Sequence, residues 1–377
     1  MRTDKTRALP PFFTQVIGSL PRPKLVLDLH TRRSQMPEKR FNSVLDEMVI
    51  FAIRLQEEAG LDVISDGEWR RIHYVGEFLD RIGGFENIRP FGHAGEQKFH
   101  QVVTSKMQTS EPVFVRDAEF LVAHTDRVTK FALPSPFLIG IRYWHEDFST
   151  DAYPTMQHFM AHLTEILVRE AKAIETAGVD IIQLDDPALT YFCDRHLMDL
   201  GETHDDRLRR IWDPEKQIPD AVSHINAIAE GLRTEVQLHC CHSVYKRQSD
   251  VTGNYEPLLP YLKNAKLDRV NLEFAYKDTG DITDLKLLPD ALGIGLGVVD
   301  VRTERIQEID EMESLGATAA QYVAPGRIAL NPDCGFAPAM GEPPSIDEAF
   351  EKLRRLVSAA KRLRERIHSQ NAKPRTH

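Results

Sequence analysis

The chain has 377 residues, of which 42% are hydrophobic and 28% are charged, and its formal net charge is −10. This composition is that of a soluble globular protein, and the excess of acidic residues argues against a nucleic-acid or anionic-membrane partner. No apolar stretch approaches the roughly 18–20 residues that span a bilayer, and Pro10 and Pro11 interrupt any signal-peptide core. We therefore expect a cytoplasmic protein, whose four cysteines are too few for a disulfide framework.

Strand-like and helix-like segments alternate along the chain. Short apolar runs predict eight strands, at residues 14–20, 62–68, 128–136, 180–189, 235–243, 268–276, 291–301 and 327–335. Amphipathic segments predict helices between several of these strands and after the last, at residues 43–60, 156–178, 303–317 and 346–367. Gly60 is a C-terminal stop for the first of these helices, and Thr303 is a candidate N-cap. Strands alternating with helices predict a parallel sheet, and eight such units predict an α/β fold closed into a (β/α)₈ TIM barrel.

The whole chain, residues 1–377, is interpreted as one barrel domain. The main insertion covers residues 84–127, and within it residues 114–126 alternate in the manner of a hairpin. Residues 1–12 and 368–377 are predicted to be loose tails.

Polar side chains gather at the predicted carboxyl ends of the strands, where the active site of such a barrel lies. They are Ser19, Asp66, Glu68, Asp185, Asp186, His239, Cys241, Glu273, Asp300, Asp333 and Cys334. A purely structural barrel strand would stay rich in Val, Ile and Leu to its end. The pattern therefore predicts a site at this face.

Four of these residues have the chemistry of a metal site. Because alternate residues of a strand share a face, His239 and Cys241 point the same way. Cys334 lies in a turn after the last strand, and a buried Glu273 needs a positive partner. Together they form a plausible tetrahedral zinc set, in which the cation would favour a thiolate. The alternative for His239 and Cys241 is a hydrogen-bonded core histidine beside a core cysteine. Cys193 and Cys240 are interpreted as core fillers.

The remaining candidates are open to more than one interpretation. Glu68 and Asp185 could bind a substrate ammonium group, act as an acid and base pair, or serve as caps and ion-pair partners. Backbone N–H groups near Ser19 could meet a carboxylate, although a simple tight turn explains that segment equally well. Arg302 could hold an anionic group or pair with Asp300.

The ordered motifs resemble the catalytic, C-terminal barrel of cobalamin-independent methionine synthase. They are IGSLP (17–21), GLDVISDGEWRR (60–71), IIQLDDPAL (181–189), LHCCHS (238–243), LEFA (272–275), GLGVVDVR (295–302) and NPDCG (331–335). The resemblance implies a (β/α)₈ fold and a catalytic Zn²⁺ held by His239, Cys241, Glu273 and Cys334. It further implies that Glu68 and Asp185 bind the amine of homocysteine, and that backbone at Ser19 meets its carboxylate.

The sequence departs from the family pattern at three points. The match covers only one of the two barrels of the full-length synthases. Arg302 stands where the family has a histidine regarded as the proton donor, so we place Arg302 and Asp300 in the catalytic group. His73 occupies the position of an expected acidic residue. The thiol side of the site matches the family, while the methyl-donor side is altered.

These features predict a zinc-dependent methyltransferase that activates a small-molecule thiol, such as homocysteine, for attack on a methyl donor. The donor would be methyltetrahydrofolate or a methyl-corrinoid, which leaves a corrinoid protein open as a partner. The alternative is a thiol alkyltransferase or lyase of the epoxyalkane:coenzyme M transferase type. A non-enzymatic zinc or corrinoid carrier-binding protein and a uroporphyrinogen decarboxylase relative are two further alternatives.

Overall fold

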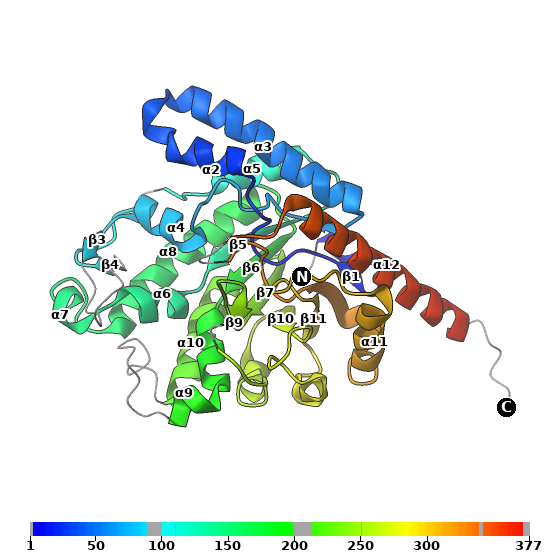
Figure 1. Ribbon diagram of the computed structural model, residues 1–377. Coiled ribbons are helices and arrows are strands. Elements are labelled where there is room, and N and C mark those ends of the chain that lie inside the picture. The colour runs from blue at the N-terminus through cyan, green and yellow to red at the C-terminus, as the bar shows by residue number, and fades with distance from the viewer. Residues whose placement is uncertain are drawn as a thin grey trace.

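Eight parallel strands form the centre of the computed structural model, which describes residues 3–88, 100–109, 111–199, 213–249, 251–338 and 342–371 (Figure 1). In sheet order the strands are β1 (Phe13–Thr14), β12 (Ile328–Pro332), β11 (Gly293–Val299), β10 (Arg269–Glu273), β7 (Glu235–Cys240), β6 (Ile181–Asp185), β5 (Val128–Pro134) and β2 (Val63–Ile64). Between the two end strands, the Asp62 N–H donates to the carbonyl of Thr14 at 3.2 Å. The nearly closed barrel and its eight predicted strands are thereby confirmed, although each strand is shorter than predicted.

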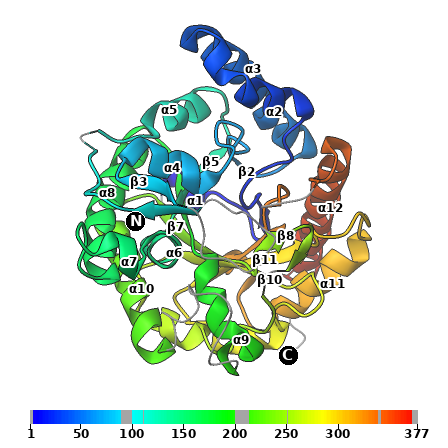
Figure 2. The same ribbon diagram turned by 60° about the vertical axis from the view of Figure 1, so that its left-hand side comes forward.

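Helices surround this barrel, as the view in Figure 2 shows. The longer ones are α2 (Lys24–Thr31), α3 (Glu38–Ala59), α4 (Tyr74–Ile82), α5 (Val115–Ala123), α6 (Pro136–Tyr143), α8 (Met156–Thr176), α10 (Pro214–Ala229), α11 (Ile309–Ala319) and α12 (Ile346–Asn371). The short helices are α1 (Asp4–Arg7), α7 (Glu146–Ser149), α9 (Arg195–Asp199), η1 (Arg33–Gln35), η2 (Pro187–Cys193), η4 (Leu259–Asn264), η5 (Ile282–Leu287) and η6 (Pro325–Arg327). Helix α3 ends at Gly60 as predicted, because glycine adopts the left-handed φ of 90° found there without steric cost. In the described part of the chain, no helix combines the length and apolar character that a membrane span requires.

The faces of the strands separate an apolar layer from a polar one. Leu133, Leu184, Leu238 and Leu296 are fully buried and pack with the helices in one hydrophobic cluster. The alternate positions carry polar side chains that meet inside the barrel. Gln15 Nε2, for example, donates to Asn271 Oδ1 at 3.0 Å although their strands are not neighbours in the sheet. The barrel is therefore a packed structure with a hydrogen-bonded polar centre.

The hairpin of the insertion lies elsewhere than predicted. Strands β3 (Phe85–Ile88) and β4 (His100–Val103) pair antiparallel at the left-hand edge of Figure 1. Residues 115–123, expected to be extended, form helix α5 instead. Phe114, Ala118 and Leu121 are fully buried, and their spacing of four and three residues is the helical period. Strands β8 (Val244–Tyr245) and β9 (Gln248–Ser249) form a second small hairpin.

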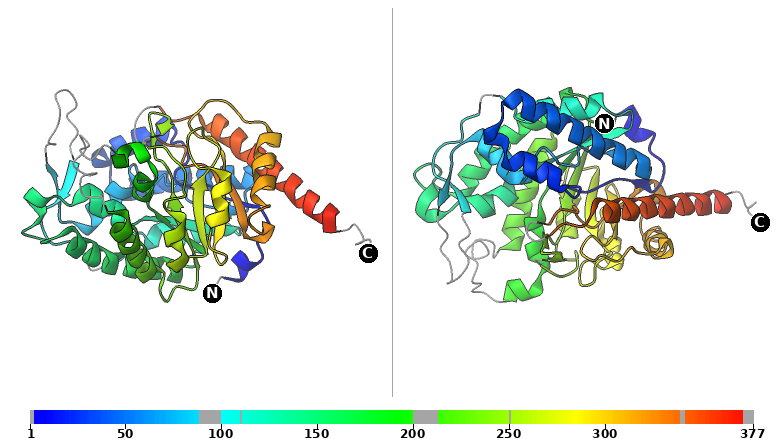
Figure 3. Two further views of the ribbon diagram at one scale, coloured as in Figure 1. Left: turned by 90° about the horizontal axis from the view of Figure 1, so that it is seen from below. Right: turned by 45° about the horizontal axis from the view of Figure 1, so that its top comes forward.

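Both expected tails are partly ordered. Thr3 caps α1 and its hydroxyl donates to Asp180 at 3.0 Å, while Phe12 is 1% exposed. Helix α12 continues to Asn371 and projects from the barrel (Figure 3). The loose-tail prediction is therefore wrong for residues 3–12 and 368–371, and residues 372–377 lie outside the described part.

Helix α11 starts later than predicted, at Ile309 rather than near Thr303. The Thr303 hydroxyl donates instead to the carboxylate of Asp300, at 2.9 Å. That local bond fixes a turn after β11, so Thr303 does not serve as the N-cap of α11.

Candidate metal and thiol site

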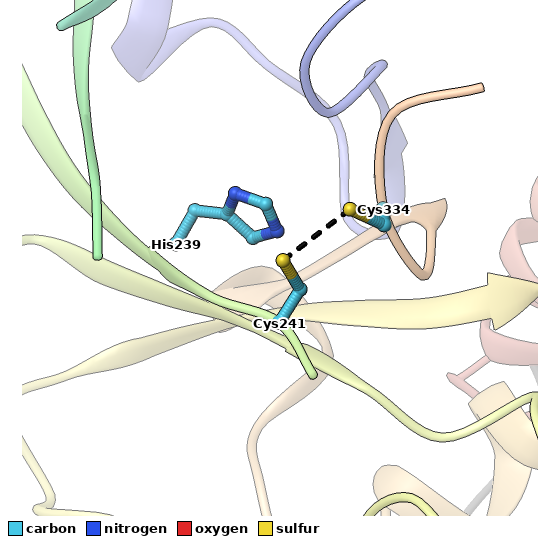
Figure 4. Close-up of side chains that lie close together, drawn as sticks. All are labelled: His239, Cys241 and Cys334. Atoms are coloured by element: carbon cyan, nitrogen blue, oxygen red, sulfur yellow. Dashed lines mark hydrogen bonds between the residues drawn. The ribbon is translucent and has the colours of Figure 1, made fainter. Parts of the chain in front are cut away.

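Three predicted ligands meet at the carboxyl ends of the strands (Figure 4). His239 lies in β7, Cys241 follows that strand, and Cys334 lies in the turn after β12. One potential ligand atom from each lies within 4.8 Å of the other two. The two Sγ atoms, 3.3 Å apart, share a hydrogen bond. An imidazole and two sulfurs in this arrangement are a donor set that zinc binds.

The histidine is oriented from behind by Asp185. Residues Asp185 and His239 are register partners on the adjacent strands β6 and β7, and Asp185 Oδ1 lies 3.0 Å from Nδ1 of the imidazole. A proton on Nδ1, donated to this carboxylate, leaves the lone pair of Nε2 for a metal. Nε2 of His239 is buried and has no hydrogen-bond partner. Its unpartnered nitrogen and the two nearby sulfurs fit a bound metal ion.

The two thiols share one negative charge. The hydrogen bond from Cys241 lowers the pKa of Cys334 to about 6, although burial opposes the shift. The same bond raises the pKa of Cys241 well above its ordinary value, and burial acts in the same direction. For His239, burial favours the neutral ring, but Asp185 and Cys334 outweigh it and raise the pKa to about 10. The site therefore already favours a thiolate.

The turn that carries Cys334 packs closely against the turn after β1. A Cβ on Gly335 would lie 2.9 Å from the backbone N of Ser19, and one on Gly18 would lie 3.2 Å from Cα of Gly335. Gly18 also has a φ of 57°, which glycine adopts readily. The Phe336 N–H donates to the carbonyl of Ser19 at 2.8 Å. The predicted substrate contact at Ser19 thus borders the metal group.

Asp333, the acidic residue of the NPDCG motif, has a structural role. Its carboxylate accepts the backbone N–H groups of Phe274, Ala275 and Tyr276 at 3.1, 3.1 and 2.8 Å. These bonds tie the loop after β10 to the turn of Cys334. Asp333 therefore holds together two of the loops that form the site.

The structure does not bring Glu273 into the metal group. Its Oε1 accepts from Arg302 at 2.8 Å, and its Oε2 accepts from the backbone N of His242 at 3.1 Å and lies 2.9 Å from Nδ1 of the same residue. Burial alone would raise the pKa of Glu273, but Arg302 and His242 together lower it. The positive partner that a buried Glu273 requires is thus an arginine, and its role as fourth ligand stays a prediction.

Arg302 and Asp300 have structural partners. The Arg302 side chain is fully buried, contacts Glu273 and the carbonyl of Ser243, and has a Nε and a Nη1 without hydrogen-bond partners. Asp300 does not form an ion pair with Arg302, as its carboxylate accepts the Arg302 backbone N–H at 2.7 Å and the Thr303 hydroxyl. Asp300 therefore fixes the turn after β11, and its catalytic role, like that of Arg302, stays a prediction.

Glu68 is held in an uncommon backbone conformation at the mouth of the barrel. Its φ is 57°, its backbone N–H donates to Asp66 at 2.9 Å, and the residue is 4% exposed. Burial raises the pKa of its carboxyl group. It lines a cavity of about 10 Å³ together with Gly18 and Gln183. Glu68 is therefore a buried carboxyl group beside a small cavity at the mouth of the barrel, and its contact with a substrate stays a prediction.

The two adjacent aspartates at the end of β6 have different surroundings. Asp185 faces His239, whereas Asp186 is fully buried and contacts the Ser135 hydroxyl at 2.5 Å. Burial raises the pKa of Asp186 to about 7. Of the two aspartates, the one predicted to belong to the site, Asp185, is the one that contacts a predicted ligand. The sequence did not suggest that Asp185 would orient His239.

Three side chains near the site were missed from the sequence. His242 stands in the LHCCHS motif and contacts Glu273. Lys130 could have been found from the sequence, because a charged residue in an otherwise apolar strand indicates a special role. Arg142 lies in the last turn of α6, and no motif pointed to it.

Comparisons with known proteins agree with this geometry. The family model of the cobalamin-independent synthase catalytic domain matches residues 12–362. A methionine synthase of Pyrococcus horikoshii is 29% identical over 97% of this chain and 96% of its own. One from Pyrococcus furiosus is 27% identical over 96% of each chain. A solved B12-independent methionine synthase from Shewanella sp. W3-18-1, in complex with selenomethionine, superposes with a TM-score of 0.75 at 23% identity, over 96% of this chain and 100% of that one.

These matches also limit the expected partners. The family and the solved relative are named for independence of cobalamin or B12, so the corrinoid partner left open above is not supported. The motifs, the barrel and the family match agree over nearly the whole sequence. The chain therefore belongs to the cobalamin-independent synthase catalytic-domain family.

Proposed function

We propose that the protein is a zinc-dependent methyltransferase that makes the sulfur of homocysteine, or of a close amino-thiol, the acceptor of a methyl group. The convergence of His239, Cys241 and Cys334 at the mouth of the barrel carries this proposal. Relatives of similar length that are named methionine synthase support homocysteine as the acceptor, and methyltetrahydrofolate is the donor that we propose.

Different residues would hold the metal and bind the substrate. His239, Cys241 and Cys334 would hold the zinc, and Asp185 orients the imidazole of His239 through Nδ1. Bound zinc supplies a positive charge that lets a thiol lose its proton near neutral pH. Glu68, together with Asp185, binds the substrate ammonium, and the turn at Ser19 faces its carboxylate. Fixing the amino acid at these points places its sulfur toward the metal group.

Replacement of Glu68 by glutamine tests substrate recognition. A hydrogen bond to a charged group contributes about 1.5–3 kcal/mol, so homocysteine should bind roughly 10–100-fold more weakly. Isothermal titration of the zinc-loaded protein measures this affinity. Glu77→Gln is the control, because Glu77 belongs to the neighbouring helix α4 and pairs with Arg81. Failure of homocysteine to bind, or equal affinity in Glu68→Gln, would contradict the proposal.

Arg142 favours a second candidate function, that of a thiol alkyltransferase of the epoxyalkane:coenzyme M transferase type. A hydrogen bond joins Arg142 to Tyr191, its Nε is buried without a partner, and within the described ranges it forms no ion pair with a carboxylate. Its charge acts on Tyr74, whose phenol also interacts with Asp185 and Cys241. Arg142 acts at a distance on the buried Asp186 but forms no ion pair with it. Such a positive charge would suit an anionic thiol such as coenzyme M, which carries a sulfonate and no amine.

Turnover of coenzyme M with epoxypropane distinguishes the two candidates. The alkyltransferase reading predicts thioether formation that falls at least about tenfold in Arg142→Met, because a charge-assisted bond to the sulfonate is lost. Arg116→Met, an exposed change on α5, is the control. Homocysteine methylation that is unaffected in Arg142→Met, with no turnover of coenzyme M, excludes this reading.

A further inference from the structure

Lys130 is a buried lysine that neither the family motifs nor the proposed chemistry uses. It lies in the middle of β5, is 2% exposed, and extends into the polar centre of the barrel. Its Nζ donates to the carbonyl of Val16, to Gln15 Oε1 at 3.3 Å and to Gln183 Oε1 at 2.9 Å. All three acceptors are neutral. Among the described residues, Lys130 forms no ion pair with a carboxylate, which is an expensive arrangement for a buried cation.

The lysine borders the proposed ammonium site. It lines the same cavity of about 10 Å³ as Glu68, which has room for roughly one water molecule. Gln183, which accepts from Lys130, donates through Nε2 to Asp185 Oδ1 at 2.7 Å. A continuous path of hydrogen bonds therefore runs from Lys130 through Gln183 to Asp185.

The charges around Lys130 come from four elements. In the segment after β2, Asp66 pairs with Arg71 at 3.3 Å, and Glu68 lies beside them. Across the barrel, Glu235 of β7 pairs with Arg269 of β10 at 3.2 Å.

The fourth element is β6, which carries Asp185. The two ion pairs balance themselves, and Oδ1 of Asp185 already lies 3.0 Å from Nδ1 of His239. Glu68 and the second oxygen of Asp185 are therefore left to stabilise the ammonium of Lys130. Burial lowers the pKa of Lys130 to about 7, while Asp185 and Glu68 act in the opposite direction.

We propose that Lys130 is the built-in counter-charge of the ammonium site, protonated while the site is free and losing its proton when the ammonium of a ligand binds Glu68 and Asp185. The proposal rests on the proposed function only in its use of these carboxylates to bind an amine. A like charge nearby disfavours a buried ammonium by about one to three pKa units. One proton passes from Nζ to solvent for each Lys130 that is neutralised, and the neutral amine keeps two N–H groups for Val16 and Gln183.

The affinity for an amine ligand should depend on pH, because the ligand's ammonium and the protonated Lys130 compete for the same carboxylates. Below pH 7 the free protein carries a protonated Lys130, which competes with the incoming ammonium, so affinity is lower. As pH rises through about 7, Lys130 becomes neutral in the free protein and the competition ends. Affinity for an amine ligand should therefore rise between about pH 6 and 8, and proton release should vanish above that range.

Calorimetry with methionine measures the released proton, because methionine has an ammonium group but no thiol to ionise. Titration of the zinc-loaded protein at pH 7, in buffers of different ionisation enthalpy, should show about half a proton released per ligand if the pKa is about 7. In Lys130→Met and Lys130→Gln this release should fall to near zero, and affinity below pH 7 should rise about tenfold or more. Lys130→Gln retains N–H donors for Val16 and Gln183, in case the methionine variant does not fold. Lys172→Gln, an exposed change on α8, is the control.

The titrations distinguish a failure of the role of Lys130 from a failure of the ammonium site. Unchanged proton release in both Lys130 variants would assign the proton to Glu68 and overturn the role of Lys130, while methionine binding itself would uphold the ammonium site. A loss of affinity without any change in proton release would show a structural role and would also overturn it. Failure of methionine and homocysteine to bind would remove the ammonium site and the proposal with it.

Discussion

Cys334→Ser is expected to remove the bound zinc and to abolish measurable methyl transfer. A serine hydroxyl does not ionise as a thiol does, so the site would lose the group whose pKa lies at about 6. Loss of residues that merely orient a ligand lowers metal affinity or activity by about 10–100-fold. Loss of a ligand itself should therefore cost more than about a hundredfold in zinc affinity. Competition with a chromophoric chelator measures the affinity, and methyl transfer to homocysteine measures the activity.

Cys240→Ala is the matched control for this experiment. Cys240 precedes Cys241, is fully buried in the hydrophobic cluster and points to the opposite face of the strand. The control should keep its zinc and lose only about 1 kcal/mol or less of stability, because a single small group is removed. Full zinc occupancy in Cys334→Ser, or equal loss in Cys240→Ala, would contradict the assigned ligand.

The barrel could be predicted because each strand has its own local sequence pattern. Runs such as residues 181–185 combine apolar residues with two polar positions on one face, Gln183 and Asp185, and turn residues separate them from amphipathic helices. Residues 114–126 misled the prediction, because valine and phenylalanine there suggested alternation. The buried spacing of Phe114, Ala118 and Leu121 fits a helix equally well, and packing against the barrel decides the outcome.

The metal site was predictable only in part. The common face of His239 and Cys241 follows from the period of a strand, Cys334 was visible as a thiol in the turn after the last strand, and the resemblance supported Glu273 as the fourth ligand. The partners of Glu273 could not be found in this way, because His242 and Arg302 lie 31 and 29 residues from it in the chain. Which cation reaches a buried carboxylate depends on the arrangement of three different loops. Local pattern predicts that such a charge needs a partner, but not which partner it has.

Arg302→Met should strongly destabilise the fold. Arg302 and Glu273 are both fully buried and form an ion pair of 2.8 Å. Removing one member of a buried pair costs about 3–5 kcal/mol, because the remaining charge has lost its partner. Urea unfolding, followed by circular dichroism, measures the change in the free energy of unfolding. Arg305→Met is the control, since Arg305 is exposed and pairs with Glu311 at the surface, where the change should be small.

The pH dependence of the same variant tests the cause. In the wild type the pKa of Glu273 is lowered, so this group stabilises the fold above its unfolded pKa and loses that contribution as pH falls. Without Arg302, burial dominates and raises the pKa of Glu273, so the penalty is present at neutral pH and is relieved as pH falls toward about 4–5. The double variant Arg302→Met/Glu273→Gln should recover part of the lost stability, because Glu273 then carries no charge, while Asp333 still lacks the Arg302 Nη1 that lies 3.9 Å from it in the wild type. A loss that is independent of pH and is not relieved in the double variant would mean that Arg302 acts through its packing over Tyr276, at 4.9 Å, rather than through Glu273.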